Sequence, residues 1–296
     1  MTHTDHLRRR LASGSPLLVP GGGTPLEALL ARQAGFDTFY VSGYAAAAWR
    51  HGLPDIGLLG IRDTIDALGA VARVTDASLI VDADTGYGDV IAVSANVREL
   101  ESIGAAAIQI EDQDWPKKCG HMDGKTVIPR DDAVRKVAAA VAARENPQTL
   151  IIARTDALAP LGIDSAIDRA KAFVDAGADM TFVDAPRSLD DLRRIAAEVP
   201  GPAMANMSEG GKTPPLALGE LGALGFDLVI YPTSALRIAS AVLGAFFREL
   251  RESGTSNPWR DRMHGLDELN EVVGLSAFLE IDRRFADGEY APTSSS

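Results

Sequence analysis

The sequence has only one cysteine among its 296 residues, so no disulfide can form within the chain. A lone cysteine is typical of a protein from a reducing compartment. There is no uninterrupted run of about 18 apolar residues, and we therefore expect no transmembrane helix. The N-terminal segment MTHTDHLRRR is charged and no apolar run follows it, which argues against a secretory signal. These absences predict a soluble, cytoplasmic protein.

Basic residues are also scarce. Lys and Arg total 29 against 41 Asp and Glu, which gives a formal net charge of −12. A protein this acidic is a poor general binder of nucleic acid or anionic membranes, and we expect neither as a partner. If the substrate is anionic, a metal ion or a few Arg and Lys side chains must make the electrostatic potential positive at the binding site. The hydrophobic content of 46% is enough for a large buried core.

Short apolar segments of β character recur along the chain, and each is followed by an Ala-rich segment with helical period. Their apolar character is continuous rather than alternating, which favours parallel strands covered on both faces. The predicted strands are 17–20, 38–41, 79–82, 107–110, 150–153, 180–183, 203–205 and 228–231. The predicted helices are 25–34, 61–74, 92–103, 133–143, 165–176, 189–197, 216–224 and 235–252. Several of these helices end at a glycine, the usual C-terminal helix stop.

Eight strand–helix units in about 250 residues predict an α/β fold of the (β/α)8 barrel type. The main alternative is a doubly wound open sheet, which favours a Gly-rich phosphate loop after the first strand. The segment 21–24 reads Gly-Gly-Gly-Thr there, but it lacks the G-x-G-x-x-G spacing. We expect a single domain, 1–296, with the barrel at about 15–255, a helical extension at about 257–287 and a frayed tail at 292–296.

Polar residues crowd the carboxyl ends of the predicted strands, where a barrel gathers its chemistry. Asp82 and Asp84 end the third strand and would face the same way, and Glu111 ends the fourth. Converging carboxylates favour a hard divalent cation. We predict that these three residues hold Mg²⁺, one of them directly and the others through water, with Mn²⁺ as a substitute. The alternatives are that Asp82, Asp84 and Asp156 cap helices and that Glu111 is solvated.

The lone cysteine, Cys119, lies in a polar loop after the fourth predicted strand, next to Lys117, Lys118, Gly120 and His121. Neighbouring cations lower the pKa of a thiol and favour the thiolate. One alternative is that the cysteine is a small buried apolar residue without a chemical role. Another is that the two lysines are simply solvated at the surface. We do not expect zinc, because one Cys and one His leave two of its four ligands unfilled.

With these residues assembled, the chain resembles the isocitrate lyase / phosphoenolpyruvate mutase superfamily from about residue 15 to residue 255. The segment Lys117–His121 is similar to the K-[KR]-C-G-H signature of the lyase branch. The other matching segments are 52–57, 82–88, 111–113, 152–157 and 206–214. The motifs are closest to those of the 2-methylisocitrate lyase, 2,3-dimethylmalate lyase and carboxyphosphonoenolpyruvate mutase groups.

The resemblance implies Mg²⁺, a substrate built on a 2-oxo or 2-hydroxy acid, and a homotetramer in which the last helix is exchanged between subunits. It also implies a role for individual residues. Cys119 would be the acid/base group on a mobile loop, and Arg154 would contact substrate oxygens. Ser42 and Gly43 would bind a pyruvate-like carboxylate. The other catalytic residues implied are Lys117, His121 and Asp184, and the other substrate-binding residues are Tyr40, Asp55, Lys118, Gly120, Asn206 and Thr213.

The sequence departs from the lyase pattern at Asp184, where those lyases usually have Glu. Asp is shorter by one carbon–carbon bond, about 1.5 Å, and a displacement of this size can cost orders of magnitude in rate. The shorter side chain would also make room for a bulkier substrate. Tyr44, where a small residue is common, and Trp49–His51 are further departures that bear on the substrate.

We predict a carbon–carbon lyase that cleaves a 2-hydroxy di- or tricarboxylate, of the 2-methylisocitrate or dimethylmalate type, to a 2-oxo acid such as pyruvate plus a carboxylate such as succinate. Bound Mg²⁺ would lower the pKa of the substrate hydroxyl. Cys119 would protonate the departing enediolate while Arg154, His121 and the two lysines offset its charge. The alternatives are a phosphonomutase, an oxaloacetate hydrolase or decarboxylase, and a catalytically silent barrel.

Overall fold

The computed structural model describes residues 2–286. The predicted tail at 292–296 and the end of the predicted extension, residue 287, lie outside the described residues. Internal contacts divide the chain into two units, one ending at Ile238 and the other beginning at Ala239. Each unit is described here by itself.

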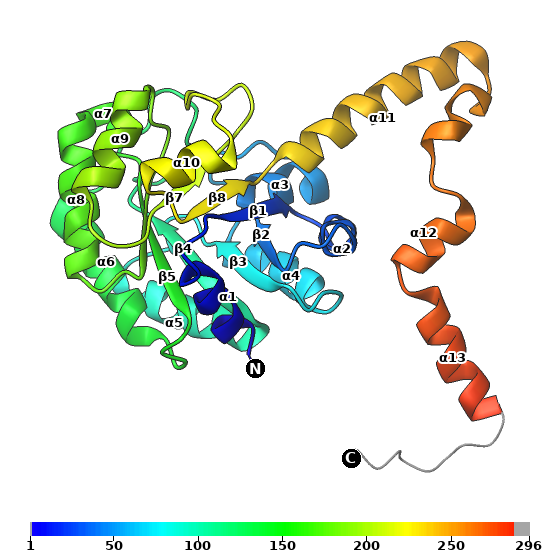
Figure 1. Cartoon of the computed structure of the whole chain (residues 1–296), viewed down its shortest axis with the longest axis horizontal. Coiled ribbons are helices and arrows are strands. Elements are labelled where there is room, and N and C mark those ends of the chain that lie inside the picture. Colours follow the sequence, from blue (N-terminus) through cyan, green and yellow to red (C-terminus); the bar gives the residue numbers. More distant parts are fainter. Residues whose placement is uncertain (1, 287–296) are drawn as a thin grey trace. The chain divides into compact units, whose positions relative to one another are not determined.

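Parallel strands form the centre of the first unit (Figure 1). Their order in the sheet is β6-β5-β4-β3-β2-β1-β8-β7. A parallel bridge between Thr181 and Ala203 joins β6 to the segment that leads into β7, so the sheet closes on itself. This sequential order confirms the predicted barrel and excludes the open doubly wound sheet. The strands are β1 Leu17–Gly22, β2 Thr38–Val41, β3 Ser78–Asp82, β4 Ala105–Glu111, β5 Leu150–Thr155, β6 Met180–Val183, β7 Met204–Asn206 and β8 Leu228–Tyr231.

Helices follow the strands and cover the outside of the sheet, as the sequence predicts. Four predicted helix stops, Gly35, Gly104, Gly177 and Gly225, have φ between +94° and +113°, a conformation that glycine adopts without strain. The helices are α2 Pro25–Gln33, α3 Gly43–Ala46, α4 Ile61–Ala72, α5 Val90–Ile103, α6 Arg130–Ala143, α7 Leu158–Leu161, α8 Ile163–Asp175, α9 Leu189–Glu198, α10 Leu218–Leu224 and α11 Ser234–Ser253, with a π-helical turn, η1, at Ala47–His51.

A helix that the sequence analysis did not predict, α1 (His3–Leu11), precedes the barrel. Its Leu7 is fully buried and packs with Leu17 and Val19 in the cluster that fills the barrel interior. The helix is largely charged, with Arg8 paired to Asp179 at 2.9 Å. Because so much of its surface is polar, the single buried leucine gave no helical period to recognise. It closes the end of the barrel where the strands begin.

The core explains why the strands read as continuous apolar runs. All residues of β4 are buried, because the strand has the barrel interior on one side and helices on the other. Large side chains such as Ile80, Ile152 and Phe182 fill the interior. The charged side chains of the strands, Asp82, Glu111 and Arg154, lie at the carboxyl ends, so they meet on one rim where a site can form.

The second unit contains the rest of α11, a 3₁₀ turn η2 (Asn257–Arg262), and helices α12 (Leu266–Val272) and α13 (Leu275–Ala286). The predicted C-terminal helical extension is therefore present. It buries little of its apolar surface within the single chain: α13 has no buried residue, and Leu266 and Phe278 are 78% and 69% exposed. No helix among residues 2–286 is both long enough and apolar enough to cross a membrane.

Candidate active site

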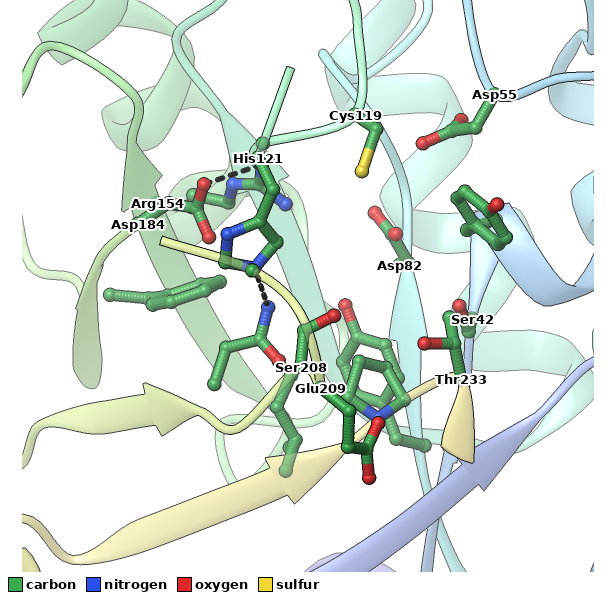
Figure 2. A pocket seen from close by; sticks show the side chains of 18 of the residues that line it. Ser42, Asp55, Asp82, Cys119, His121, Arg154, Asp184, Ser208, Glu209 and Thr233 are labelled. Atoms are coloured by element: carbon green, nitrogen blue, oxygen red, sulfur yellow. Dashed lines mark hydrogen bonds and ion pairs between the residues drawn. The ribbon is translucent and has the colours of Figure 1, made fainter. Parts of the chain in front are cut away.

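A cavity of about 270 Å³ lies among the carboxyl ends of the strands in the first unit (Figure 2). Its position follows from the barrel, because parallel strands deliver the residues after each of them to one rim. The sequence-predicted residues that line it are Tyr40, Ser42, Asp55, Asp82, Lys117, Lys118, Cys119, Gly120, His121, Arg154, Asp184 and Asn206.

The other four predicted site residues do not line the cavity. Three of them contact residues that do: the backbone N–H groups of Gly43 and Asp84 donate to Asp82 at 3.3 and 3.1 Å, and Glu111 pairs with Arg154 at 3.2 Å. The fourth, Thr213, is buried, and its hydroxyl has no hydrogen-bond partner among the described residues.

Buried carboxylates surround the ammonium group of Lys117. It lies 2.5 Å from Asp84 and also pairs closely with Asp55. Burial raises the pKa of Asp84 to about 7; the charge of Lys117 opposes this shift and the charge of Asp82 adds to it. Burial likewise raises the pKa of Glu111 well above its ordinary value. The carboxylates therefore exceed the cations that the chain itself supplies here.

A hard cation fits this excess of carboxylate oxygens. Within the described residues, no three His, Cys, Asp or Glu side chains converge closely enough to hold a metal together. The direct and water-mediated roles of Asp82, Asp84 and Glu111 at a metal therefore stay a prediction.

The helix-cap alternative for these aspartates is wrong. Helix α5 is capped by Asp89, whose carboxylate accepts from the backbone N–H groups of Ile91 and Ala92 at 3.0 and 3.4 Å. Helix α7 begins after Ala157, which offers no side-chain cap. Asp84 and Asp156 instead pair with the ammonium groups of Lys117 and Lys125. Asp82 accepts from the backbone N–H groups of Gly43 and Asp84 and lies on the cavity.

The thiol of Cys119 points into the cavity in Figure 2, on the side of Asp82. Burial raises the pKa of the thiol, and the charge of Asp55 adds to the shift. The expectation that two lysines lower this pKa is therefore wrong. Lys117 turns into Asp55 and Asp84, and Lys118 donates to the backbone carbonyl of Gly124 at 2.8 Å. Neither ammonium faces the sulfur, and the thiol stays protonated at neutral pH.

Arg154 is held rigidly in the wall of the cavity. Two of its N–H groups donate to Asp156 at 2.8 and 3.0 Å, the bidentate arrangement that a guanidinium favours. Its cationic carbon lies 5.3 Å from the centre of the Phe182 ring. The same guanidinium is 3.5 Å from the Asp184 carboxylate.

Asp184 lies beside Arg154 and His121 (Figure 2). Burial alone would raise the pKa of Asp184, but the charges of Arg154 and Lys125 hold it below its ordinary value, so the carboxylate stays ionised. Burial lowers the pKa of His121, which is therefore neutral at pH 7. Its Nδ1 accepts from the backbone N–H of Lys212 at 3.2 Å, so the proton of the neutral ring sits on Nε2. The side-chain nitrogen of Asn206 lies 3.4 Å from Nε2.

Several residues of the site escaped the sequence analysis. Gln109 accepts from the Tyr40 hydroxyl at 2.9 Å and donates to Asp82 at 3.3 Å inside the barrel. Lys125 pairs with Asp156 at 2.7 Å. Neither carries a sequence signal beyond its place in or after the fourth strand. Further lining residues come from the loops after β7 and β8 and from the start of α11, and they include Ser208, Glu209, Pro232, Thr233 and Arg237.

The chain is similar to known proteins over almost its whole length. The family model described as phosphoenolpyruvate phosphomutase matches residues 7–251. The chain is 38% identical to the 2,3-dimethylmalate lyase of Eubacterium barkeri, over 95% of this chain and 98% of that protein. It is 45% identical to the probable 2-methylisocitrate lyase 1 of Corynebacterium glutamicum, over 90% of this chain and 87% of that protein.

Solved structures show the same relationship. The crystal structure of 2,3-dimethylmalate lyase, a PEP mutase/isocitrate lyase superfamily member, matches with a TM-score of 0.91 and 33% identity, over 100% of this chain and 99% of that one. The complex of phosphonopyruvate hydrolase with oxalate and Mg²⁺ matches with a TM-score of 0.88 and 29% identity, over 97% and 100% of the two chains. The chain belongs to the PEP mutase/isocitrate lyase superfamily.

Proposed function

We propose that this protein is a Mg²⁺-dependent carbon–carbon lyase that cleaves a 2-hydroxy di- or tricarboxylate to a 2-oxo acid, such as pyruvate, plus a carboxylate. The observation that carries the proposal is the placement of a protonated thiol, Cys119, in the same small cavity as the Asp82 carboxylate and Arg154. Relatives at 38% and 45% identity that are named as lyases support it.

The metal proposal is supported by the carboxylates and by the Mg²⁺ in the phosphonopyruvate hydrolase complex. Asp82, Asp84 and Glu111 would hold the ion, and Mn²⁺ would substitute for it. When bound, the ion would supply Lewis acidity that lowers the pKa of the substrate hydroxyl.

Cys119 would hold the proton that the departing half of the substrate needs. That half leaves as an enediolate, a strong base, so a group that is protonated at neutral pH suits the step. The raised thiol pKa keeps the proton on Sγ until the enediolate forms. Closure of the Cys119 loop would exclude water during the reaction.

Arg154 and His121 would bind and orient the substrate. The pKa of Arg154 is raised well above its ordinary value: burial opposes the shift, but the charges of Asp156 and Asp184 outweigh it, so the guanidinium stays charged. It would face a carboxylate of the substrate without reorganising, because Asp156 fixes its plane. Neutral His121 would donate from Nε2.

A pyruvate-release assay tests the function. Purified protein is incubated with a panel of 2-hydroxy diacids and triacids, with Mg²⁺ or with EDTA, and 2-oxo acid products are measured. We expect release from at least one substrate of the 2-methylisocitrate or dimethylmalate type, and none with EDTA. Turnover of oxaloacetate or of a phosphonate alone would instead indicate one of the alternative activities.

We also propose that the C-terminal helices exchange between subunits of a homotetramer. Apolar side chains on α11, α12 and α13 remain exposed in the single chain. An exposed apolar surface of this extent is typical of a subunit interface. The residues involved include Ile238, Phe247, Leu266, Leu269, Val273, Phe278, Leu279 and Ile281.

A further inference from the structure

Lys125 is the most deeply buried lysine of the site, and its side chain has no exposed surface. Its ammonium donates to Asp156 at 2.7 Å, to Asp184 at 3.3 Å and, in a close contact, to the backbone carbonyl of Gly120. An ammonium has three N–H donors, so these three acceptors satisfy it completely.

The three acceptors belong to separate parts of the site. Asp156 follows β5, Asp184 follows β6, and Gly120 lies in the loop that carries Cys119. Burial would lower the pKa of Lys125, but the charges of Asp156 and Asp184 outweigh it and raise the pKa above its ordinary value. The lysine is therefore charged at neutral pH and binds the loop to the rim of the barrel.

The contact at Gly120 shows how closely the loop lies against the rim. A Cβ on Gly120 would come within 1.9 Å of the Asp184 carboxylate and 2.5 Å of an Arg154 nitrogen. Only a residue without a side chain fits this approach. The loop is therefore closed onto Asp184 and Arg154, and Lys125 joins the Gly120 carbonyl of the loop to the Asp184 carboxylate.

We propose that Lys125 is a positioning residue that holds the Cys119 loop closed over the cavity and fixes Asp184 beside Arg154. Only the expected effect of Lys125 on turnover rests on the proposed function. The loop has other anchors as well. Cys119 donates its backbone N–H to the Asp55 carbonyl at 3.1 Å, His121 accepts from Lys212, and Asp123 pairs with Lys212. Loss of Lys125 therefore frees the Gly120 side of the loop without detaching the whole loop.

The single cysteine of the chain makes loop closure measurable without substrate. We would compare the rate of Cys119 alkylation by iodoacetamide, followed by mass spectrometry, in the parent protein and in Lys125→Met. We expect at least a tenfold faster alkylation in the variant, and a fall in kcat of at least tenfold with a smaller change in KM. Lys171→Met, at an exposed lysine on α8, is the matched control and should alkylate at the parent rate.

A second control separates positioning from general loss of stability. Arg144 pairs with Asp179 at 2.5 Å, at the end of the barrel away from the cavity. Arg144→Met should lower the midpoint of thermal unfolding and leave Cys119 alkylation unchanged. If Lys125→Met does not fold, the double variant Lys125→Met/Asp184→Asn keeps the buried charge balanced, and the same acceleration is expected.

Alkylation of folded Lys125→Met, or of the double variant, at a rate within twofold of the parent would overturn the proposal. Lys125→Arg keeps the charge and should recover part of the protection. The two proposals fail separately. If the parent turns over no 2-hydroxy acid but Lys125→Met still exposes Cys119, the proposed function is wrong and the positioning role stands.

Discussion

The backbone N–H of Cys119 donates to the backbone carbonyl of Asp55 at 3.1 Å. This bond joins two loops that are distant in the sequence, and it fixes the thiol over the cavity. The Asp55 carboxylate also pairs with the ammonium of Lys117. This pairing offsets the positive charge that would otherwise lower the pKa of the Cys119 thiol. The thiol is therefore placed as an acid rather than as a thiolate nucleophile.

Cys119→Ser should fold and bind substrate but lose about 10²-fold or more in kcat, as expected when a positioned general acid is removed. A hydroxyl is similar in size to a thiol but is a much poorer proton donor. Steady-state kinetics on the best 2-hydroxy diacid measures the loss, and binding of a substrate analogue checks the site. A phosphonomutase does not need this proton, so near-parent turnover would show that Cys119 is not the acid.

The pH dependence of the reaction should follow the raised pKa of Cys119. An acid works only while protonated, so activity should persist through neutral pH and decline only above the ordinary thiol value of about 8.5. The rate of Cys119 alkylation should rise over the same high pH range, because it needs the thiolate. A fall in kcat with rising pH that is complete below pH 8 would contradict this assignment.

Removal of the metal should abolish turnover. We expect full loss after chelation with EDTA and recovery with added Mg²⁺. Asp84→Asn should raise the Mg²⁺ concentration needed for half-maximal activity at least tenfold, because it removes one buried carboxylate. Asp131→Asn, at a side chain that is 86% exposed, is the control and should behave as the parent. Undiminished activity in EDTA would disprove the metal requirement.

A charge on the exposed face of α13 should break the assembly. Phe278 and Ile281 are 69% and 50% exposed in the single chain. The double substitution Phe278→Asp/Ile281→Asp would bury two charges in the proposed interface, so we expect a smaller oligomer by light scattering after size-exclusion chromatography. Glu280→Ala lies on the same helix and should keep the parent size. An unchanged mass in the double variant would argue against an interface on this helix.

The buried pair of Arg169 and Asp112, 3.0 Å apart, should matter for stability. Arg169→Met leaves the Asp112 carboxylate buried without its cation, and we expect a loss of about 3 kcal/mol in the free energy of unfolding by urea. Arg130 pairs with Asp168 at 2.6 Å on the surface, and Arg130→Met should cost at most about 1 kcal/mol. Equal losses in the two variants would mean that burial does not set the cost.

The sequence by itself determined the barrel and most of the cavity. Continuous apolar segments and glycine helix stops are local patterns, and a barrel brings the ends of its strands to one rim whatever their separation in the chain. Asp82, Cys119 and Arg154 could therefore be assigned to one cavity from the sequence alone. The charged helix α1 could not be predicted, because its role depends on one buried leucine in a polar surface.

Only the tertiary structure decided how the charges are shared. The sequence places Lys117 and Lys118 beside Cys119, which suggests a lowered thiol pKa, but the fold turns both ammonium groups away and burial raises that pKa. It also brings Lys125 against Asp156 and Asp184, which follow two other strands. Electrostatic effects act across space over a few ångströms and depend on burial, so spacing along the chain could not determine them.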